Sequence, residues 1–221
     1  VAAGLRLRRR LGTATHAGCS RTQNEDFFRH LWVGDDCWAA VADGCGGEAA
    51  GEVAARLAID SFSEHLAAHI ASGRDVSFVI REAVVTANQR VLAAAEKPGH
   101  KGMATTFSGI YLHGRTIVSC HVGDSRICRW RDGQLDVMTE DHTWVAVEVK
   151  AGRLSAQAAE KHPRASWLVR ALGMKDFVAP DMDISVAWEG DQYLLASDGL
   201  FRCFKPAEIG TFLAFEPQES V

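Results

Sequence analysis

Several features that identify common classes of protein are absent from this sequence. No apolar run approaches the roughly 20 residues that a membrane-spanning helix needs, and none has the short apolar core of a signal peptide. Basic residues are not in excess, because 24 Lys and Arg stand against 28 Asp and Glu, for a net charge of −4. A protein that binds nucleic acid by neutralising phosphates has the opposite balance. We therefore expect neither a membrane nor a nucleic acid as its partner.

Paired cysteine motifs are absent as well. The six cysteines are scattered without CxxC spacing, which excludes a zinc ribbon and a dithiol redox motif. A chain of 221 residues with 47% hydrophobic residues can bury its own core without disulfides. It also lacks any repeat, low-complexity tract or linker that would divide it. The sequence therefore predicts one globular domain, a monomer with reduced thiols in the cytoplasm.

Hydrophobic periodicity predicts two long helices followed by a series of strands. Apolar residues recur at helical spacing over residues 48–69 and over 76–95, and Pro98-Gly99 ends the second helix. Strands are expected at residues 13–16, 38–42, 105–112, 116–122, 125–130, 182–187 and 193–196. Early helices and later strands joined by hairpin-length turns favour an antiparallel sheet with helices on its faces.

Three acidic residues stand beside glycines where strands are expected to begin or end. The three segments are Ala42-Asp43-Gly44, Val122-Gly123-Asp124 and Ser197-Asp198-Gly199. A single Asp-Gly pair usually marks a turn, but two of these pairs follow apolar strands that have no hairpin partner. Carboxylates that converge repel one another, so such a cluster implies bound cations, and an oxygen-only set selects hard ions over zinc.

An earlier polar turn extends the acidic set. Glu25 and Asp26 lie in this turn, and Arg21 comes four residues before Glu25. The planar guanidinium of an arginine binds phosphate oxygens in pairs. The residues alone thus indicate a site that holds divalent cations and a phosphate.

Seven segments in order resemble the motifs of a known family, the type 2C metal-dependent serine/threonine protein phosphatases, and its bacterial branch in particular. Together they span nearly the whole chain. They are Arg21-Thr22-Gln23-Asn24-Glu25-Asp26, Val41-Ala42-Asp43-Gly44-Cys45-Gly46-Gly47 followed by Gly51-Glu52, Gly102-Met103-Ala104-Thr105-Thr106, His121-Val122-Gly123-Asp124-Ser125-Arg126, Thr139-Glu140-Asp141-His142-Thr143, Leu168-Val169-Arg170-Ala171-Leu172-Gly173 and Leu195-Ala196-Ser197-Asp198-Gly199-Leu200.

The resemblance implies a fold and a domain organisation. The fold is α+β, a four-layer α-β-β-α sandwich of two antiparallel sheets flanked by helices, with metals at one end. Residues 1–221 then form a single type 2C phosphatase domain that lacks the family's final helix and strand. Residues 144–165 occupy the place of the family's mobile flap, where Arg153, Lys161 and Arg164 are expected to help choose substrates.

The same resemblance assigns roles at a site of two or three Mg²⁺ or Mn²⁺ ions. It implies that Asp43 bridges two ions, with the carbonyl of Gly44 helping to hold one of them. Asp198 binds the other ion, Glu25 binds directly or through water, and Asp124 joins Asp198 at a third ion. The two remaining roles are orientation of metal-bound water by Asp26 and binding of the substrate phosphate by Arg21.

The implied reaction is hydrolysis of phosphoserine and phosphothreonine in proteins by a metal-activated water. Phosphoprotein substrates and a cognate Ser/Thr kinase are the partners that follow from it. Cys45 stands where relatives carry His or Met, and we expect it to pack, because a thiol of pKa near 8.5 is a poor acid at neutral pH.

Two other readings of the sequence stay open. The family's last metal-binding Asp, in a D-N-x-T motif, does not appear after Asp198, which suggests a regulatory module that binds phosphoproteins without turnover. Separately, residues 44–49 fit the dinucleotide pattern G-x-G-x-x-[G/A]. That fingerprint needs a strand after its helix, whereas the periodicity here predicts a second helix.

Overall fold

The computed structural model describes residues 10–19, 22–46 and 50–214. Its strands are β1 (Asp26–Val33), β2 (Asp36–Cys45), β3 (Ala104–Thr105), β4 (Phe107–His113), β5 (Thr116–Val122), β6 (Arg126–Arg131), β7 (Gln134–Val137), β8 (Asp181–Val186) and β9 (Gln192–Ala196). Its helices are α1 (Ala50–His69), α2 (Val76–Ala95), α3 (Trp144–Lys150), α4 (Ala156–Glu160), α5 (Asp198–Cys203) and α6 (Pro206–Ala214). No helix within these ranges is long and apolar enough to cross a membrane.

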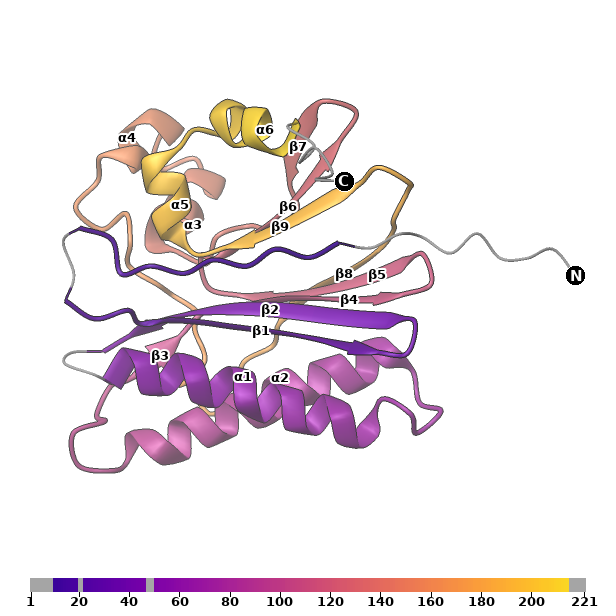
Figure 1. Ribbon diagram of the computed structural model, residues 1–221. Helices are drawn as coiled ribbons and strands as arrows, with labels where there is room; N and C mark the ends of the chain where they lie inside the picture. Colours follow the sequence, from indigo (N-terminus) through magenta and orange to yellow (C-terminus); the bar gives the residue numbers. More distant parts are fainter. Residues whose placement is uncertain (1–9, 20–21, 47–49, 215–221) are drawn as a thin grey trace, which may run out of the picture.

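The strands form two antiparallel sheets. The larger has the order β1-β2-β4-β5-β8, with β3 paired to the end of β2, and the smaller has the order β7-β6-β9. Figure 1 shows α1 and α2 below the larger sheet, the smaller sheet above it, α3 and α5 at the left end of the smaller sheet, and α4 and α6 higher still. The predicted four-layer α+β sandwich is therefore confirmed.

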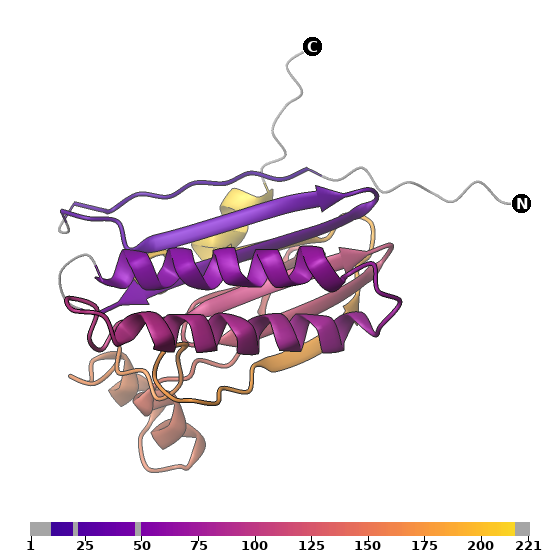
Figure 2. The same cartoon turned by 90° about the horizontal axis from the view of Figure 1, so that it is seen from below.

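The main core lies between α1, α2 and the larger sheet. The two helices run side by side across one face of that sheet (Figure 2). The ring of Phe62 on α1 contacts Trp38 and Phe107 on the strands, with ring centroids 5.6 and 4.7 Å away. All three residues are at most 3% exposed, so their contacts fix the helical layer on the sheet.

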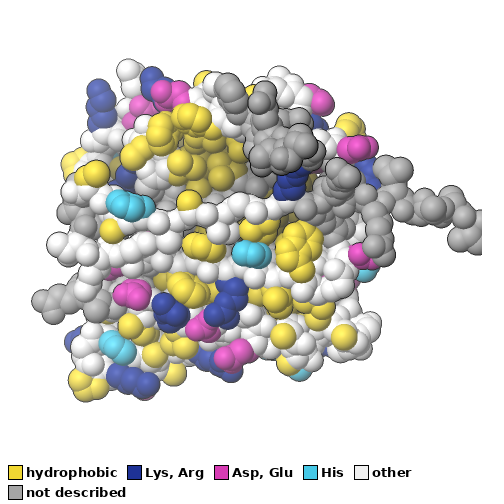
Figure 3. All heavy atoms as spheres, in the orientation of Figure 1, with side chains coloured by type: hydrophobic (Ala, Val, Ile, Leu, Met, Phe, Trp, Pro, Cys, Tyr) yellow, Lys and Arg dark blue, Asp and Glu magenta, His cyan; other side chains and the backbone are white. Residues whose placement is uncertain are grey.

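The helices outside the smaller sheet bury their apolar side chains less completely than α1 and α2 do. Phe204 and Phe212 on either side of the start of α6 pack edge to face with centroids 5.5 Å apart, yet are 38% and 62% exposed. Figure 3 shows hydrophobic side chains gathered on this side of the molecule. The two helical layers therefore differ in how well they are buried.

Most predicted elements are found, but one predicted strand is absent, and β1, β7, α5 and α6 were not predicted. Helix α2 has the predicted bounds, and Asp75 caps it by accepting a hydrogen bond from the amide of Phe78 at 3.1 Å. The strand predicted at Thr13–His16 is wrong, since that stretch is exposed and has no strand assignment. Periodicity does not indicate β1, because this edge strand has no alternating pattern of its own. It is defined instead by its eight residue pairings with β2.

The topology brings particular strand ends together. Strand β2 is antiparallel to β4, which is antiparallel to β5, so the carboxyl ends of β2 and β5 lie at one end of the sheet. Strand β1 begins at the same end, because it is antiparallel to β2. The acidic residues of the sequence motifs stand at these strand ends.

Candidate active site

Asp26 and Asp43 are neighbours on adjacent strands. They are directly opposite each other in the β1–β2 register, and the amide of Gly44 donates to the carbonyl of Glu25 at 3.1 Å. The backbone thus holds Glu25, Asp26 and Asp43 together at the end of the sheet. Asp26 and Asp43, 17 positions apart in the sequence, become adjacent because the hairpin register aligns them.

Both backbone polar groups of Asp43, its amide and its carbonyl, form hydrogen bonds. Its amide donates to the hydroxyl of Thr106 at 2.8 Å, and its carbonyl accepts from the amide of Thr106 at 2.9 Å and the hydroxyl of Thr105 at 3.0 Å. Both threonines are buried. This cradle fixes the direction in which the Asp43 side chain leaves the strand.

The start of α1 lies almost against the end of β2. A Cβ added to Gly44 would lie 1.9 Å from the carbonyl oxygen of Gly51, and a Cβ added to Gly51 would lie 2.5 Å from Oε1 of Glu25. No side chain fits between these segments. The two glycines therefore let the first described turn of α1 approach both Asp43 and Glu25.

Asp124 follows β5 and is 8% exposed. The preceding Gly123 has φ +112, a conformation that side chains rarely adopt, and a Cβ there would lie 2.6 Å from the side chain of Thr106. Thr106 thus contacts both the Asp43 strand end and the loop that carries Asp124. These contacts explain why a glycine precedes this aspartate.

Asp198 opens α5 directly after β9. The hydroxyl of the preceding residue, Ser197, donates to Oδ2 of Asp26 at 2.8 Å, which ties the smaller sheet to the larger one. Nη2 of Arg202, one helical turn later, lies 2.5 Å from Oδ2 of Asp198. Residues four positions apart on a helix lie on the same face, so this spacing is the sequence signal that could have indicated the pair.

The charges of the site act on one another. Burial, together with the negative charges of Asp198 and Asp141, raises the pKa of Asp124 to about 7. Burial raises the pKa of the Cys45 thiol to about 11, with contributions from Asp43, Asp124 and Glu25. Cys45 therefore keeps its proton at neutral pH, and carboxylates from distant parts of the chain act on this thiol and on Asp124.

The donor set fits hard divalent cations. All the candidate side-chain ligands are carboxylates, and the pKa of Asp124 is raised first by burial and then by the negative charges of Asp198 and Asp141. Within the described residues, no three His, Cys, Asp or Glu side chains are grouped closely enough to hold an ion by themselves. Mg²⁺ usually keeps several of its waters and binds one or two carboxylates, so it does not require such a group.

A buried histidine pair supports the loop before Asp124, and the sequence analysis did not single it out. Nδ1 of His142 accepts from the amide of Gly123 at 3.0 Å, while its Nε2 lies 3.0 Å from Asp181. The ring of His121 stacks on it at 4.6 Å, and burial lowers the pKa of His121 to about 4. Neutral histidines therefore position this loop.

A second support is the ion pair between Arg126 and Asp141. The guanidinium binds the carboxylate through both oxygens, at 2.8 and 2.6 Å, and stacks 4.9 Å from the ring centroid of Phe201 on α5. Such bidentate pairs have a defined geometry as well as charge. This pair joins β6, the Asp141 segment and α5 around Asp124 and Asp198.

The three basic residues predicted for the flap differ in their surroundings. Arg153 forms two 2.7 Å hydrogen bonds with Glu148, so its charge is already paired. The guanidinium of Arg164 lies 4.6 Å from the ring centroid of Trp167 and 5.1 Å from that of Trp144. Lys161 ends α4 and is exposed. Arg21, the predicted phosphate-binding residue, lies outside the described residues.

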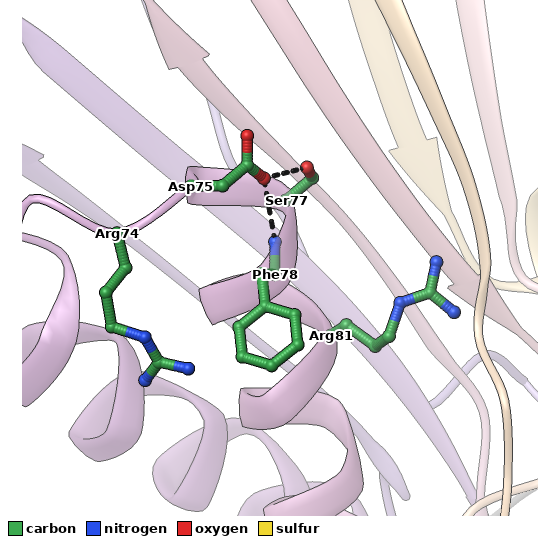
Figure 4. Close-up of a pocket in the computed structure, with 5 residues that line it drawn as sticks. All are labelled: Arg74, Asp75, Ser77, Phe78 and Arg81. Atoms are coloured by element: carbon green, nitrogen blue, oxygen red, sulfur yellow. Dashed lines mark hydrogen bonds between the residues drawn. The ribbon is translucent and has the colours of Figure 1, made fainter.

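A hollow of about 490 Å³ lies far from these carboxylates. Arg74, Asp75, Ser77, Phe78 and Arg81 line it, where α2 begins (Figure 4). Helix α1 separates it from the acidic end, because 20 helical residues span about 30 Å. Arg74 pairs with Glu82 at 2.8 Å and Asp75 adds a negative charge, so the basic character of the hollow is largely cancelled.

The dinucleotide alternative does not fit the fold. Helix α1 is followed by α2, and the strands around β2 are antiparallel, whereas a dinucleotide fold needs a parallel strand–helix–strand unit. Asp43 would also face a pyrophosphate with like charge. Residues 47–49 of the proposed fingerprint lie outside the described part of the chain.

Comparison with known proteins gives a consistent result. The sequence profile described as "Protein phosphatase 2C" matches residues 15–218. The serine/threonine protein phosphatase PstP of Mycobacterium tuberculosis is 37% identical over 195 residues, which is 86% of this chain and 36% of that protein. The protein phosphatase PhpP of Streptococcus pneumoniae is 30% identical over 200 residues, covering 88% of this chain and 80% of PhpP. The chain thus spans about a third of the length of its mycobacterial relative.

Solved structures share the fold. The serine/threonine phosphatase of S. agalactiae superposes with a TM-score of 0.87 at 30% identity, covering 93% of this chain and 86% of that one. The catalytic domain of PstP, solved in complex with two manganese ions, has a TM-score of 0.78 at 33% identity, covering 92% of this chain and 83% of that domain. The acidic end described above therefore belongs to a fold for which a manganese complex has been solved.

Proposed function

This chain belongs to the protein phosphatase 2C family, and from that premise we propose that it hydrolyses phosphoserine and phosphothreonine in proteins with Mg²⁺ or Mn²⁺ as cofactor. The observation that carries the proposal is that Glu25, Asp43 and Asp124, which come from three strand ends, all act on the Cys45 thiol, while Asp198 from a fourth strand end acts on Asp124. Carboxylates placed together in this way repel a phosphate unless cations neutralise them. The site therefore needs its metals for binding as well as for hydrolysis.

The residues divide into those that hold the ions and those that position them. Asp43, the Gly44 carbonyl, Asp198, Glu25 and Asp124 are the proposed ligands of two or three ions. Bound ions of this kind neutralise the phosphate and lower the pKa of the attacking water. The hydrogen bonds with Thr105 and Thr106 hold the backbone of Asp43, so only rotation of its side chain is left to adjust when the ions bind.

Asp26 has a different proposed task. Its carboxylate accepts a hydrogen bond from Ser197 on the other sheet, so it is already oriented between the two sheets. From this position it can accept a proton or a hydrogen bond from a water near Asp43, its neighbour in the strand register. Arg21 is proposed to bind the substrate phosphate, on the strength of its place in the family motif.

The partners and location are proposals of the same kind. Phosphoproteins are the substrates, and a Ser/Thr kinase that phosphorylates them is the expected counterpart. A monomer in the cytoplasm agrees with six free cysteines, two of which, Cys19 and Cys203, are exposed. We further propose that residues 144–165 form a flap beside the site.

A metal-dependence assay tests the function. The chain is expected to hydrolyse p-nitrophenyl phosphate and a phosphothreonine peptide in the presence of Mn²⁺, and to lose activity to background when a chelator removes the metal. Restoring the metal should restore the rate, which separates metal loss from unfolding. A rate that is unchanged by chelation, with the metal content verified, would contradict a metal-dependent mechanism.

The regulatory-module alternative makes the opposite prediction. Such a module binds a phosphopeptide but shows no turnover at saturating Mn²⁺. The structure favours the enzyme, because it keeps Asp26, Asp43, Asp124 and Asp198 within one connected arrangement of backbone contacts and charges. A phosphopeptide-binding module has no chemical need for that acidic set.

Charge neutralisation in the proposed flap should separate its three basic residues. Lys161→Ala and Arg164→Ala are expected to change the ranking of phosphopeptides by several-fold in kcat/KM, with little change toward p-nitrophenyl phosphate. Arg153→Ala is the matched comparison, because its charge is paired with Glu148 and cannot easily reach a substrate. An unchanged ranking in the Lys161 and Arg164 variants would remove the flap from substrate choice.

A further inference from the structure

Arg202 is the basic residue placed directly on the acidic site. Its guanidinium contacts Oδ2 of Asp198 at 2.5 Å, and the helical spacing of four residues keeps the two side chains on the same face of α5. The side chain of Asp198 is 25% exposed, whereas that of Arg202 is 57% exposed. The more exposed guanidinium side chain therefore pairs with a carboxylate that is largely covered.

The positive charge of Arg202 reaches a second carboxylate. It lowers the pKa of Asp124, which is opposite in sign to the effects of Asp198 and Asp141. Asp124 is 8% exposed and has little water to screen it. One cationic side chain thus contacts Asp198 and acts on Asp124, the two carboxylates that the family resemblance assigns to a third ion.

A guanidinium and a divalent ion compete for such a position. Both neutralise carboxylates, and their like charges repel each other at contact distance. The guanidinium stays charged at any physiological pH. It is also part of the same helix as Asp198, so its contact with that carboxylate costs little translational entropy, whereas binding of a free ion does. A free ion at that position must displace it. Asp198 still keeps acceptor capacity, because a carboxylate has about four lone-pair sites.

We propose that Arg202 takes the place of a third cation between Asp198 and Asp124, so that this chain binds two divalent ions rather than three. The proposal rests on the proposed metal-dependent function and deepens it. Arg202 acts here as a built-in counter-charge for the acidic site. It reduces the number of divalent ions that the chain needs and leaves Asp43 and Glu25 available to the two remaining ions.

Counting bound Mn²⁺ tests the proposal directly, without reference to activity. Isothermal titration calorimetry and equilibrium dialysis are expected to give two ions for the unmodified chain. Arg202→Gln removes the charge at an exposed position and is expected to bind a third ion, of weaker affinity. Arg202→Lys keeps a positive charge and is expected to return the count to two.

The matched control is Arg90→Gln, which removes a comparable exposed arginine whose partner is Glu64 on the helical layer away from the site. It should bind two ions like the unmodified chain. Circular dichroism confirms that each variant is folded before its ions are counted.

The possible failures are distinguishable. Three ions in the unmodified chain, or two in Arg202→Gln, would overturn the role of Arg202 while leaving metal-dependent hydrolysis intact. No bound Mn²⁺ and no hydrolysis in the unmodified chain would overturn the proposed function, and the role of Arg202 with it.

Discussion

Asp43→Asn is expected to lower kcat/KM for Mn²⁺-dependent hydrolysis by about 10³-fold or more while the chain stays folded. Asn matches Asp in shape but carries no charge, so it can hold two cations side by side far less well. The backbone of this residue is fixed by Thr105 and Thr106 through bonds that do not involve the side chain. The variant therefore removes the charge and leaves the cradle.

Two measurements accompany this prediction. The Mn²⁺ affinity should fall together with the rate, because the same carboxylate is proposed to serve both. Asp132→Asn is the control, since Asp132 sits in the β6–β7 hairpin at φ +50, a conformation that Asn adopts readily. It should keep nearly full activity. Comparable rates in both variants would show that Asp43 does not hold the metals.

Gly44→Ala is expected to destabilise the chain by about 3 kcal/mol and to lower activity about 100-fold. The added methyl group would lie 1.9 Å from the carbonyl oxygen of Gly51, so β2 and α1 must move apart. The neighbouring groups are backbone atoms, which cannot give way as a side chain does. Since Asp43 precedes Gly44, the movement displaces the proposed bridging carboxylate as well.

The second Asp-Gly pair of the site is the natural control. A Cβ at Gly199 meets nothing closer than 4.0 Å, so Gly199→Ala should keep both stability and activity. Urea unfolding measures the free energy, and initial rates with a phosphopeptide measure the activity. Equal unfolding midpoints for Gly44→Ala and the unmodified chain would show that the close contact of α1 with β2 does not matter.

Local sequence signals predicted the elements that have strong patterns of their own. The second helix has a cap at Asp75 and a Pro98-Gly99 stop, and its bounds were predicted correctly. Strand β1 was missed because an edge strand is defined by its partner, and a strand was expected wrongly at residues 13–16, where exposed residues have none. Pairing depends on contacts that lie outside any local window.

The same difference between local sequence signals and long-range contacts applies to the site. The sequence by itself determined which chemistry is available, because carboxylates next to glycines at strand ends, in the order of a known family, leave few alternatives. Only the tertiary structure decided how those groups are held: Thr106 against both Asp43 and Gly123, Ser197 against Asp26, and Arg202 against Asp198. Three of these four contacts join residues at least 17 positions apart, whose proximity comes from sheet register and the packing of the two sheets. The contact of Arg202 with Asp198 is local, but its consequence depends on Asp124, which only folding brings near.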